Sequence, residues 1–188
     1  MPYPAKLNPE TILNAAQSLL EEGGPEALNM RSLAEGLSVR PSSLYRHYPG
    51  REGLLCALEQ RAMLALRQAL EAASQGLLPR EALVAAAHAY LRYARLHPHL
   101  YALLLTPACG DPAQQASGKR LWNTLLALVG ALSGHPDDTD HAVAFWTFLH
   151  GFAVLERSGM FGESGPRGGL QVGLDALLDH MAEAGRPA

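Results

Sequence analysis

The stretch SVRPSSLYRHYPGREGLL, Ser38 to Leu55, concentrates basic and aromatic side chains in a chain of 188 residues whose formal net charge is -3. Pro41 presets the first turn of a short helix, and Pro49 must end it, because the residue before a proline is pushed out of helical conformation. Residues 31 to 51 hold four arginines against one glutamate. Phosphate contacts need such local charge and do not need a basic chain. The stretch is therefore a candidate for contact with nucleic acid.

Two further helices are expected before this stretch. The first opens with Asn8 as its N-cap and Pro9 at its first helical position, carries an apolar stripe and stops at a pair of glycines. The second covers about residues 30 to 37. Leu44 and Tyr48 of the third helix would pack on it and leave the polar side chains outside. Two short helices joined by a short turn, after a longer one, form a helix-turn-helix unit, whose last helix reads DNA.

The rest of the chain also predicts helices. Val and Ile are rare, while Ala, Leu, Glu, Gln and Arg recur with a period near 3.6, so the fold class is all-α. A long helix is expected from Arg51 to about Gln75. Further helices are expected over 80–97, 98–105, 114–133, 140–158 and 170–184. We divide the chain into a DNA-binding domain, residues 1–61, which includes the start of the long helix, and a helical domain, residues 62–188.

The string SLAEGLSVRPSSLYRHYPGREGLLCAL resembles the DNA-binding domain of the TetR family of bacterial transcriptional repressors, and the likeness covers roughly residues 8 to 60. The family pattern combines an apolar pair in the second helix, a small residue and Val in the turn, two aromatic-containing pairs, and a basic position before two leucines. The matching residues here are Leu33-Ala34, Ser38-Val39, Leu44-Tyr45, His47-Tyr48, Arg51 and Leu54-Leu55.

The resemblance implies a role for each matching position. Tyr45 and His47 are expected to press against the DNA backbone, and Arg51 to meet a phosphate at the start of the long helix, whose free N–H groups also favour anions. Arg40 or Arg46 suits a guanine edge. One sequence does not decide which arginine reads a base. The expected DNA-contacting set is Arg31, Arg40, Pro41, Ser42, Ser43, Tyr45, Arg46, His47 and Arg51.

The chain departs from the family pattern at two positions. The residue before the turn Val is usually Gly, and here it is Ser38, for which we predict a positive φ at a cost of about 1 kcal/mol. The third helix usually begins with a Ser or Thr cap. Arg40 stands there instead and cannot accept an N–H bond, for which Pro41 partly compensates.

A second resemblance concerns the helical domain. AYLRYARLHPHLYALLL and FWTFLHGFAVLE resemble the C-terminal domain of TetR relatives named for a Trp-His-Gly signature, here Trp146, His150 and Gly151. His150 is open to two interpretations, as a core or interface residue or as a ligand contact.

The resemblance also implies an effector pocket in this domain. Its expected apolar lining is Met63, Leu66, Tyr90, Tyr93, Leu104, Trp122, Leu126, Phe145 and Leu149. Few charges lie on these faces. The expected effector is therefore a small apolar or aromatic molecule with a hydrogen-bonding group.

The two last helices predict a homodimer. The helix over 140–158 is apolar almost all round, so it is expected to be buried on both sides. Paired with the last helix, it would form half of an intermolecular four-helix bundle across a twofold axis. The interface set is Trp146, His150, Phe152, Leu174, Leu177, Leu178 and Met181. Two recognition helices would then reach major grooves about 34–36 Å apart on a near-palindromic operator.

The sequence thus predicts a TetR-type regulator, most simply a repressor that an effector releases from DNA. The reverse effect, in which the effector favours DNA binding, stays open. No cofactor is expected. Without a signal peptide or a long apolar run, the chain is expected to be cytoplasmic and without a membrane partner. Its two cysteines, Cys56 and Cys109, suggest a reducing compartment and no disulfide, with a redox pair as the minor alternative.

Two other functions stay open. Histidines and aspartates of the helical domain, His141 and Asp138 among them, would suit a helical-bundle metal enzyme. Against this, no Glu-x-x-His or His-Glu-x-x-His motif occurs, so we expect no metal and no enzyme activity. The other alternative, an adaptor that retains the fold without binding DNA, is disfavoured by Arg40, Arg46 and Arg51.

Overall fold

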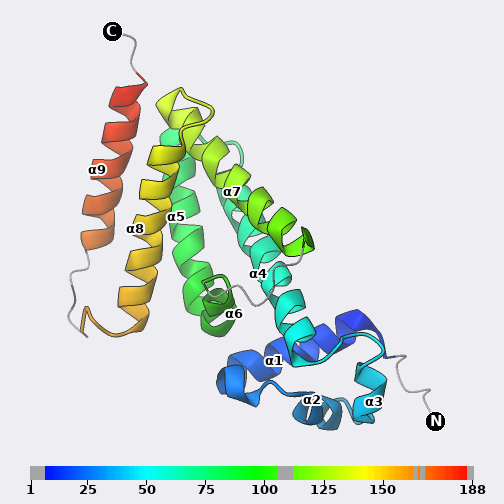
Figure 1. The fold of residues 1–188 in the computed structure, drawn as a ribbon. Coiled ribbons are helices and arrows are strands. Elements are labelled where there is room, and N and C mark those ends of the chain that lie inside the picture. Colours follow the sequence, from blue (N-terminus) through cyan, green and yellow to red (C-terminus); the bar gives the residue numbers. More distant parts are fainter. Residues whose placement is uncertain (1–6, 106–111, 163–164, 166–167, 186–188) are drawn as a thin grey trace. The chain divides into compact units, whose positions relative to one another are not determined.

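The computed structural model describes residues 7–105, 112–162, 165 and 168–185, and within these ranges every regular element is a helix (Figure 1). The all-α prediction is confirmed. The helices are α1 (Pro9–Ala27), α2 (Met30–Gly36), α3 (Pro41–Leu44), α4 (Arg51–Ser74), α5 (Pro79–Leu96), α6 (Pro98–Leu103), α7 (Pro112–Ser133), α8 (Thr139–Arg157) and α9 (Gly169–Ala184). Most bounds lie within two residues of the predicted ones, and the exceptions are α3 and the end of α1.

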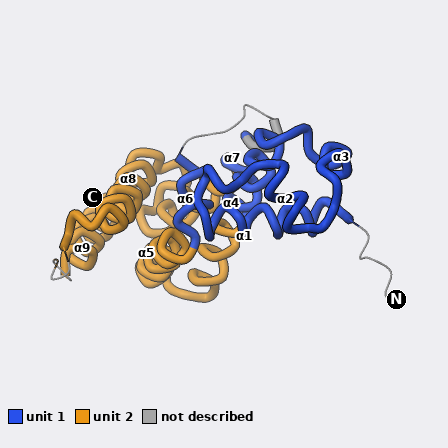
Figure 2. Tube along the Cα trace, turned by 90° about the horizontal axis from the view of Figure 1, so that it is seen from below, with its two compact units in different colours: residues 1–64, 97–118 blue, residues 65–96, 119–188 orange. Residues whose placement is uncertain are grey.

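The helices form two compact units, coloured separately in Figure 2. The first unit comprises residues 1–64 and 97–118, and the second comprises residues 65–96 and 119–188. The segment 97–118, which we had placed in the helical domain, therefore clusters with the helix-turn-helix. Both α4 and α7 contribute residues to each unit.

The helix-turn-helix of the first unit begins with a capped α1. The Asn8 side chain accepts an N–H bond from Thr11 at 2.8 Å, as an N-cap does. The regular helix breaks at Gly24, whose φ of 71° is followed by Pro25, and a last short turn continues to Ala27. The predicted stop at the glycine pair therefore marks a kink rather than the end of the element.

The turn between α2 and α3 depends on Ser38. Its φ is 55°, so the predicted left-handed conformation is confirmed. The Val39 N–H closes the end of α2 by donating to the Ala34 carbonyl at 2.9 Å. Arg40 occupies the N-cap of α3 without a side-chain cap bond, also as expected. This strained turn fixes the direction in which α3 leaves α2.

Ser38→Gly is expected to stabilise the protein by about 0.5–1 kcal/mol, because glycine adopts positive φ without the Cβ clash. Part of the gain is offset, because glycine also raises the conformational entropy of the unfolded chain. The midpoint of chemical denaturation should rise with an unchanged m-value. Ser32→Gly inside α2 is the matched control and should lose about 0.5 kcal/mol. Equal losses in both variants would contradict strain at Ser38.

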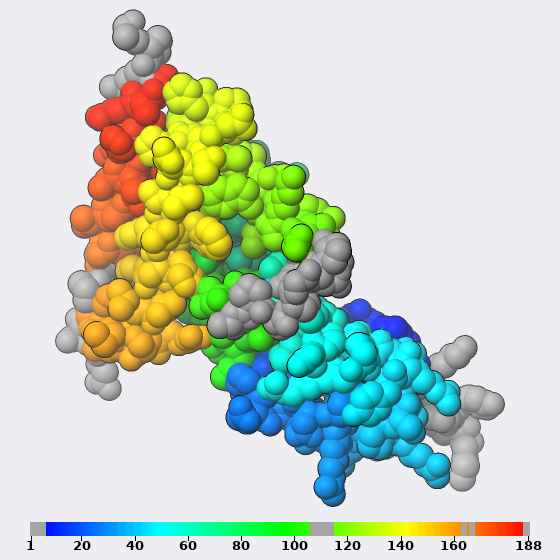
Figure 3. Space-filling view, viewed as in Figure 1, coloured from blue at the N-terminus to red at the C-terminus, as the bar shows by residue number. Residues whose placement is uncertain are grey.

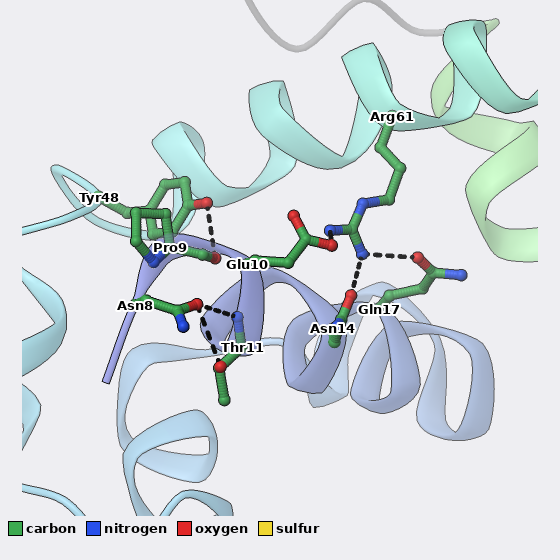
Figure 4. Close-up of polar contacts among 8 residues, drawn as sticks. All are labelled: Asn8, Pro9, Glu10, Thr11, Asn14, Gln17, Tyr48 and Arg61. Carbon is green, nitrogen blue, oxygen red and sulfur yellow. Dashed lines mark hydrogen bonds and ion pairs between the residues drawn. The ribbon is translucent and has the colours of Figure 1, made fainter. Parts of the chain in front are cut away.

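The third helix is shorter than predicted. It spans Pro41–Leu44 and closes with an i to i+3 bond from the His47 N–H to the Leu44 carbonyl, which tightens the chain ahead of Pro49. Leu44 is fully buried as expected. The half-buried Tyr48 also reaches α1, where its hydroxyl donates to the Pro9 carbonyl at 3.1 Å (Figure 4).

Polar side chains also join α4 and α6 to α1. The Arg61 guanidinium of α4 reaches three side chains of α1, donating to Asn14 at 2.6 Å and to Gln17 at 3.1 Å and pairing with Glu10 at 2.7 Å (Figure 4). Further along α1, the Glu21 carboxylate accepts the N–H groups of His99 and Leu100 at 3.2 and 3.0 Å. Glu21 thereby caps the first turn of α6 from another helix.

Candidate nucleic-acid interface

The residues predicted to contact DNA lie on the surface around α3. Arg40, Pro41 and Ser42 at its start are exposed, and so are Arg46 and His47 after its end. The Tyr45 side chain is 56% exposed. Ser43 is half-buried. Because buried Leu44 anchors this short helix, the neighbouring polar side chains are held outward.

The charges of this surface are available to a partner. Arg31 in the first turn of α2 is exposed, as are Arg40 and Arg46. Within the part of the chain that the structure describes, none of these three guanidinium groups has an acidic partner. The N–H groups at the start of α3 lack a side-chain cap. Together these donors suit the phosphate oxygens and base edges of a duplex.

Arg51 lies at the first position of α4 and is also exposed, but its side chain is turned toward α1. Its Nε donates to the Leu28 carbonyl at 2.8 Å and its Nη2 to the Pro25 carbonyl at 2.7 Å. These contacts join the end of α1 to the start of α4. The sequence predicted a phosphate contact for Arg51 and did not predict these two hydrogen bonds.

In the second unit, seven of the nine residues expected to line a pocket gather on α4, α5, α7 and α8. Five are buried, and Trp122 and Leu126 are half-buried. The five buried residues are Leu66, Tyr90, Tyr93, Phe145 and Leu149. The other two, Met63 and Leu104, belong to the first unit.

An aromatic cluster of Tyr90, Trp122 and Trp146 joins α5, α7 and α8. The indole N–H of Trp146 donates to the Tyr90 hydroxyl at 3.2 Å, and the two tryptophan rings are tilted with centroids 6.0 Å apart. Trp146 remains 42% exposed. We had assigned Trp146 to a dimer interface, and within the protomer it contacts two of the residues expected to line a pocket.

Three residues of the predicted dimer interface are buried inside one chain. Leu174, Leu178 and Met181 of α9 are 0% exposed. They form the stripe by which α9 packs on its own protomer, beside α8. A side chain without exposed surface in the protomer cannot contact a second copy, so the interface assignment of these three was wrong. The apolar period of α9 predicted that this face is buried, but it did not predict whether the face packs on its own chain or on a second copy.

The other interface candidates keep some exposed surface. Leu177 and Phe152 are half-buried, and the Phe152 ring packs between Phe148 and Phe161 at centroid distances of 6.3 and 5.1 Å. His150 is half-buried as well, and burial lowers its pKa, with Arg157 adding to the effect. Both effects favour the neutral form of the imidazole.

An exposed apolar surface on α8 and α9 was missing from the predicted interface. It includes Val143 and Leu155 of α8 and Val172 of α9, which is 71% exposed. The two helices lie side by side, yellow and orange to red, in Figures 1 and 3. At Gly151 of α8 an added Cβ would meet no atom within 4 Å. The sequence signal was the presence of apolar residues off the buried stripe of each helix.

The histidines considered for metal binding do not gather into a ligand set within the described ranges, where no group of three His, Cys, Asp or Glu residues suits a metal ion. His141 Nδ1 lies 2.8 Å from the Asp138 carboxylate at the start of α8, and its ring lies 5.2 Å from that of His180. In the described ranges, no helix has the length and apolar character needed to cross a membrane.

Cys56 on α4 corrects the expectation of no disulfide. It is disulfide-bonded. Cys109, the other cysteine of the chain, lies outside the described residues.

Two family models match the sequence and together cover most of the chain. Residues 12–58 match the model described as "Bacterial regulatory proteins, tetR family". Residues 83–184 match the model described as "Tetracyclin repressor-like, C-terminal domain". The likeness to the Trp-His-Gly group remains a prediction.

Individual proteins are also similar. An uncharacterized HTH-type transcriptional regulator of Mycobacterium tuberculosis is 31% identical over 162 residues, which are 84% of this chain and 73% of the relative. A tetracycline repressor protein of class A from Escherichia coli is 47% identical over 60 residues, 32% of this chain and 27% of its own.

Solved structures share the fold over nearly the whole chain. A protein of unknown function from Rhodococcus sp. RHA1 superposes with a TM-score of 0.81 at 26% identity and covers 97% of both chains. A TetR transcriptional regulator from Streptomyces coelicolor superposes with a TM-score of 0.73 at 22% identity, covering 96% of this chain and 100% of its own. The second likeness, at this identity, is one of fold.

Proposed function

Because this chain belongs to the TetR family of bacterial transcription regulators, we propose that it is a repressor, which binds a near-palindromic operator as a homodimer and leaves it when a small, mostly apolar molecule binds. The observation that carries the DNA part is the exposed basic surface around α3. Arg40, Tyr45, Arg46 and His47 project there from a turn held by buried Leu44. In this proposal Arg40 or Arg46 reads a base edge and the others hold phosphates.

Binding to an arbitrary duplex tests the DNA part before any operator is known. The protein is titrated into a labelled duplex of random sequence at salt concentrations from about 50 to 200 mM. We expect binding at low salt and a steep fall as salt rises, because counterions are released from phosphates. The chain has a net charge of -3, so background attraction to DNA is not expected. Failure to bind at low salt would contradict the function.

The homodimer is proposed on the exposed faces of α8 and α9. Val143, Leu155 and Val172 present apolar surface there, and Gly151 leaves room for a closely approaching helix. Apolar surface of this kind on adjacent helices is typical of interfaces between copies of a chain. A homodimer would also present two recognition helices to one operator.

Gly151→Arg is expected to yield a folded monomer. An added Cβ at this position meets no atom within 4 Å, and replacing glycine inside a helix favours the helix by about 0.8–1 kcal/mol. In a dimer the new side chain would occupy the approach path of the second copy. Sedimentation equilibrium should report the mass of two chains for the wild type and of one chain for the variant.

Leu64→Arg is the matched control. Leu64 is an exposed leucine of α4 in the first unit, whereas α8 and α9 belong to the second. This variant should remain dimeric. A Gly151→Arg protein that sediments as a dimer, with normal helical content, would place the interface on another surface.

The effector is proposed to bind at the cluster of Tyr90, Trp122 and Trp146. These rings offer flat apolar surface with a hydroxyl and an indole N–H for orientation, which favours an aromatic or apolar ligand with one hydrogen-bonding group. The chain contains two tryptophans, and both lie in the cluster. Intrinsic tryptophan fluorescence therefore reports directly on a ligand added from a library of such compounds.

Release from DNA is proposed to follow from reciprocal coupling. An effector that weakens operator binding must itself bind more weakly, by the same factor, to the operator-bound protein. Affinities measured with and without the other partner test this equality. If the two affinities are independent, the effector part of the proposal fails, and the DNA part is unaffected.

A further inference from the structure

We infer that Arg51 is a positioning residue, which holds the recognition unit in its binding conformation by capping the end of α1, and that it does not act as a phosphate contact. The inference rests on the proposed DNA binding. It differs from the role that the TetR pattern implies for this position. It follows from where the guanidinium group is placed.

The first argument concerns α1, which ends with unsatisfied carbonyl groups, as every helix does. The last turn of α1 has no basic residue of its own. Leu28, which follows the helix, is 0% exposed, so its carbonyl needs a partner inside the protein. Arg51 donates to that carbonyl at 2.8 Å and to the carbonyl of Pro25 at 2.7 Å. A cation at this end also complements the helix dipole.

The second argument concerns α4, where the charge of Arg51 is misplaced. Arg51 is the first residue of α4, and a cation at a helix N-terminus opposes the dipole of that helix. Glu52 in the same turn has the sign that the dipole favours. The arginine therefore brings α4 no local benefit. Its benefit is the bond to the carbonyls 23 and 26 residues away.

The third argument concerns geometry. Pro25 and Leu28 flank the short last turn of α1, after the break at Gly24, and the chain enters α2 at Met30. Arg51 stands just after the segment that leaves α3. One planar guanidinium thus joins the entry to α2 with the exit from α3. A fork that bonds two carbonyls at once fixes this closure in a way that a single ammonium group cannot.

Arg51→Lys is the decisive variant because it keeps the charge and loses the fork. The probe is the duplex enriched by wild-type protein from a random pool, and binding is measured across a salt series at a temperature where circular dichroism shows each protein to be folded. If Arg51 positions the unit, the lysine variant should bind about 10-fold more weakly with an unchanged salt slope. Its melting temperature should also fall by about 3 °C.

Two matched variants complete the set. Arg92→Lys, at an exposed arginine of α5 in the second unit and outside the expected DNA-contacting set, should leave both affinity and melting temperature near those of the wild type. Arg51→Gln should resemble Arg51→Lys in affinity and in salt slope. If Arg51 instead held a phosphate, Arg51→Lys would bind like the wild type and Arg51→Gln would make the salt slope shallower by about 1.8, which is about 0.9 for each of the two copies in the dimer.

Each outcome decides the inference. A weaker affinity at constant slope, together with a lower melting temperature, supports it. Wild-type behaviour of Arg51→Lys overturns it in favour of a phosphate contact. A lower melting temperature with unchanged affinity of the folded protein overturns the positioning role and leaves a contact that only stabilises the fold. A wild type that binds no duplex rejects the proposed function instead, while the melting temperatures still test the cap.

Discussion

Leu178→Arg is expected to abolish cooperative folding of the second unit. Leu178 is 0% exposed in the protomer and lies on the buried stripe of α9. Removing a core leucine alone costs about 2–5 kcal/mol, and the guanidinium group would have to be buried without a partner. Native proteins have only about 5–15 kcal/mol of stability to lose. Thermal unfolding followed by circular dichroism should show a lost or strongly lowered transition.

Leu177→Arg is the control for this prediction. Leu177 is the neighbouring residue, is half-buried and has the same size and helix propensity, so its variant should unfold cooperatively with a smaller loss. Equal behaviour of the two variants would contradict the packing of α9 described above. A folded, monomeric Leu178→Arg protein would restore the interface that the sequence had suggested.

Alanine at both Arg40 and Arg46 is expected to remove most of the operator affinity. Each arginine contributes about 1–3 kcal/mol if it holds a base or a phosphate, which corresponds to roughly 10- to 100-fold. Both side chains are exposed, so the melting temperature should stay within about 1 °C of the wild type. Fluorescence anisotropy with the selected duplex provides the affinities.

The single variants separate the two roles of these arginines. Removing a phosphate contact makes the salt slope shallower by about 0.9 for each of the two copies in the dimer, and it weakens binding to every sequence alike. Removing a base contact instead relaxes the sequence preference at the operator position that the side chain reads. Arg92→Ala is the control, because Arg92 is an exposed arginine of α5 in the second unit. Loss of affinity in that control as large as in the α3 variants would contradict the assigned surface.

Most of the fold could be predicted from the sequence because its signals are local. Asn8, Pro9, Pro41 and the 3.6-residue apolar period determine where helices begin and which side they bury. The φ of Ser38 followed from one residue standing where the family has glycine. The length of α3 did not follow, because the end of that helix depends on how the chain tightens after Leu44 and on the bond from Tyr48 to α1.

The site was predictable only in part. Exposed positions around α3 follow from the helix-turn-helix pattern, whereas the cap provided by Arg51 joins residues that are 23 and 26 positions apart and leaves no local trace. The stripe of Leu174, Leu178 and Met181 shows what an apolar period does not predict, which is the surface that covers the buried face. An apolar period reports that a face is buried, and both a neighbouring helix and a second copy satisfy it.

Selection of bound sequences from a random duplex pool tests the central claim most directly. The claim is that two copies of the surface around α3 read one operator. Wild-type protein should enrich a near-palindrome whose half-sites are one helical turn apart, about 10–10.5 base pairs from centre to centre, or a multiple of that spacing. If folded, dimeric protein enriches no sequence, sequence-specific operator binding by this chain would be contradicted.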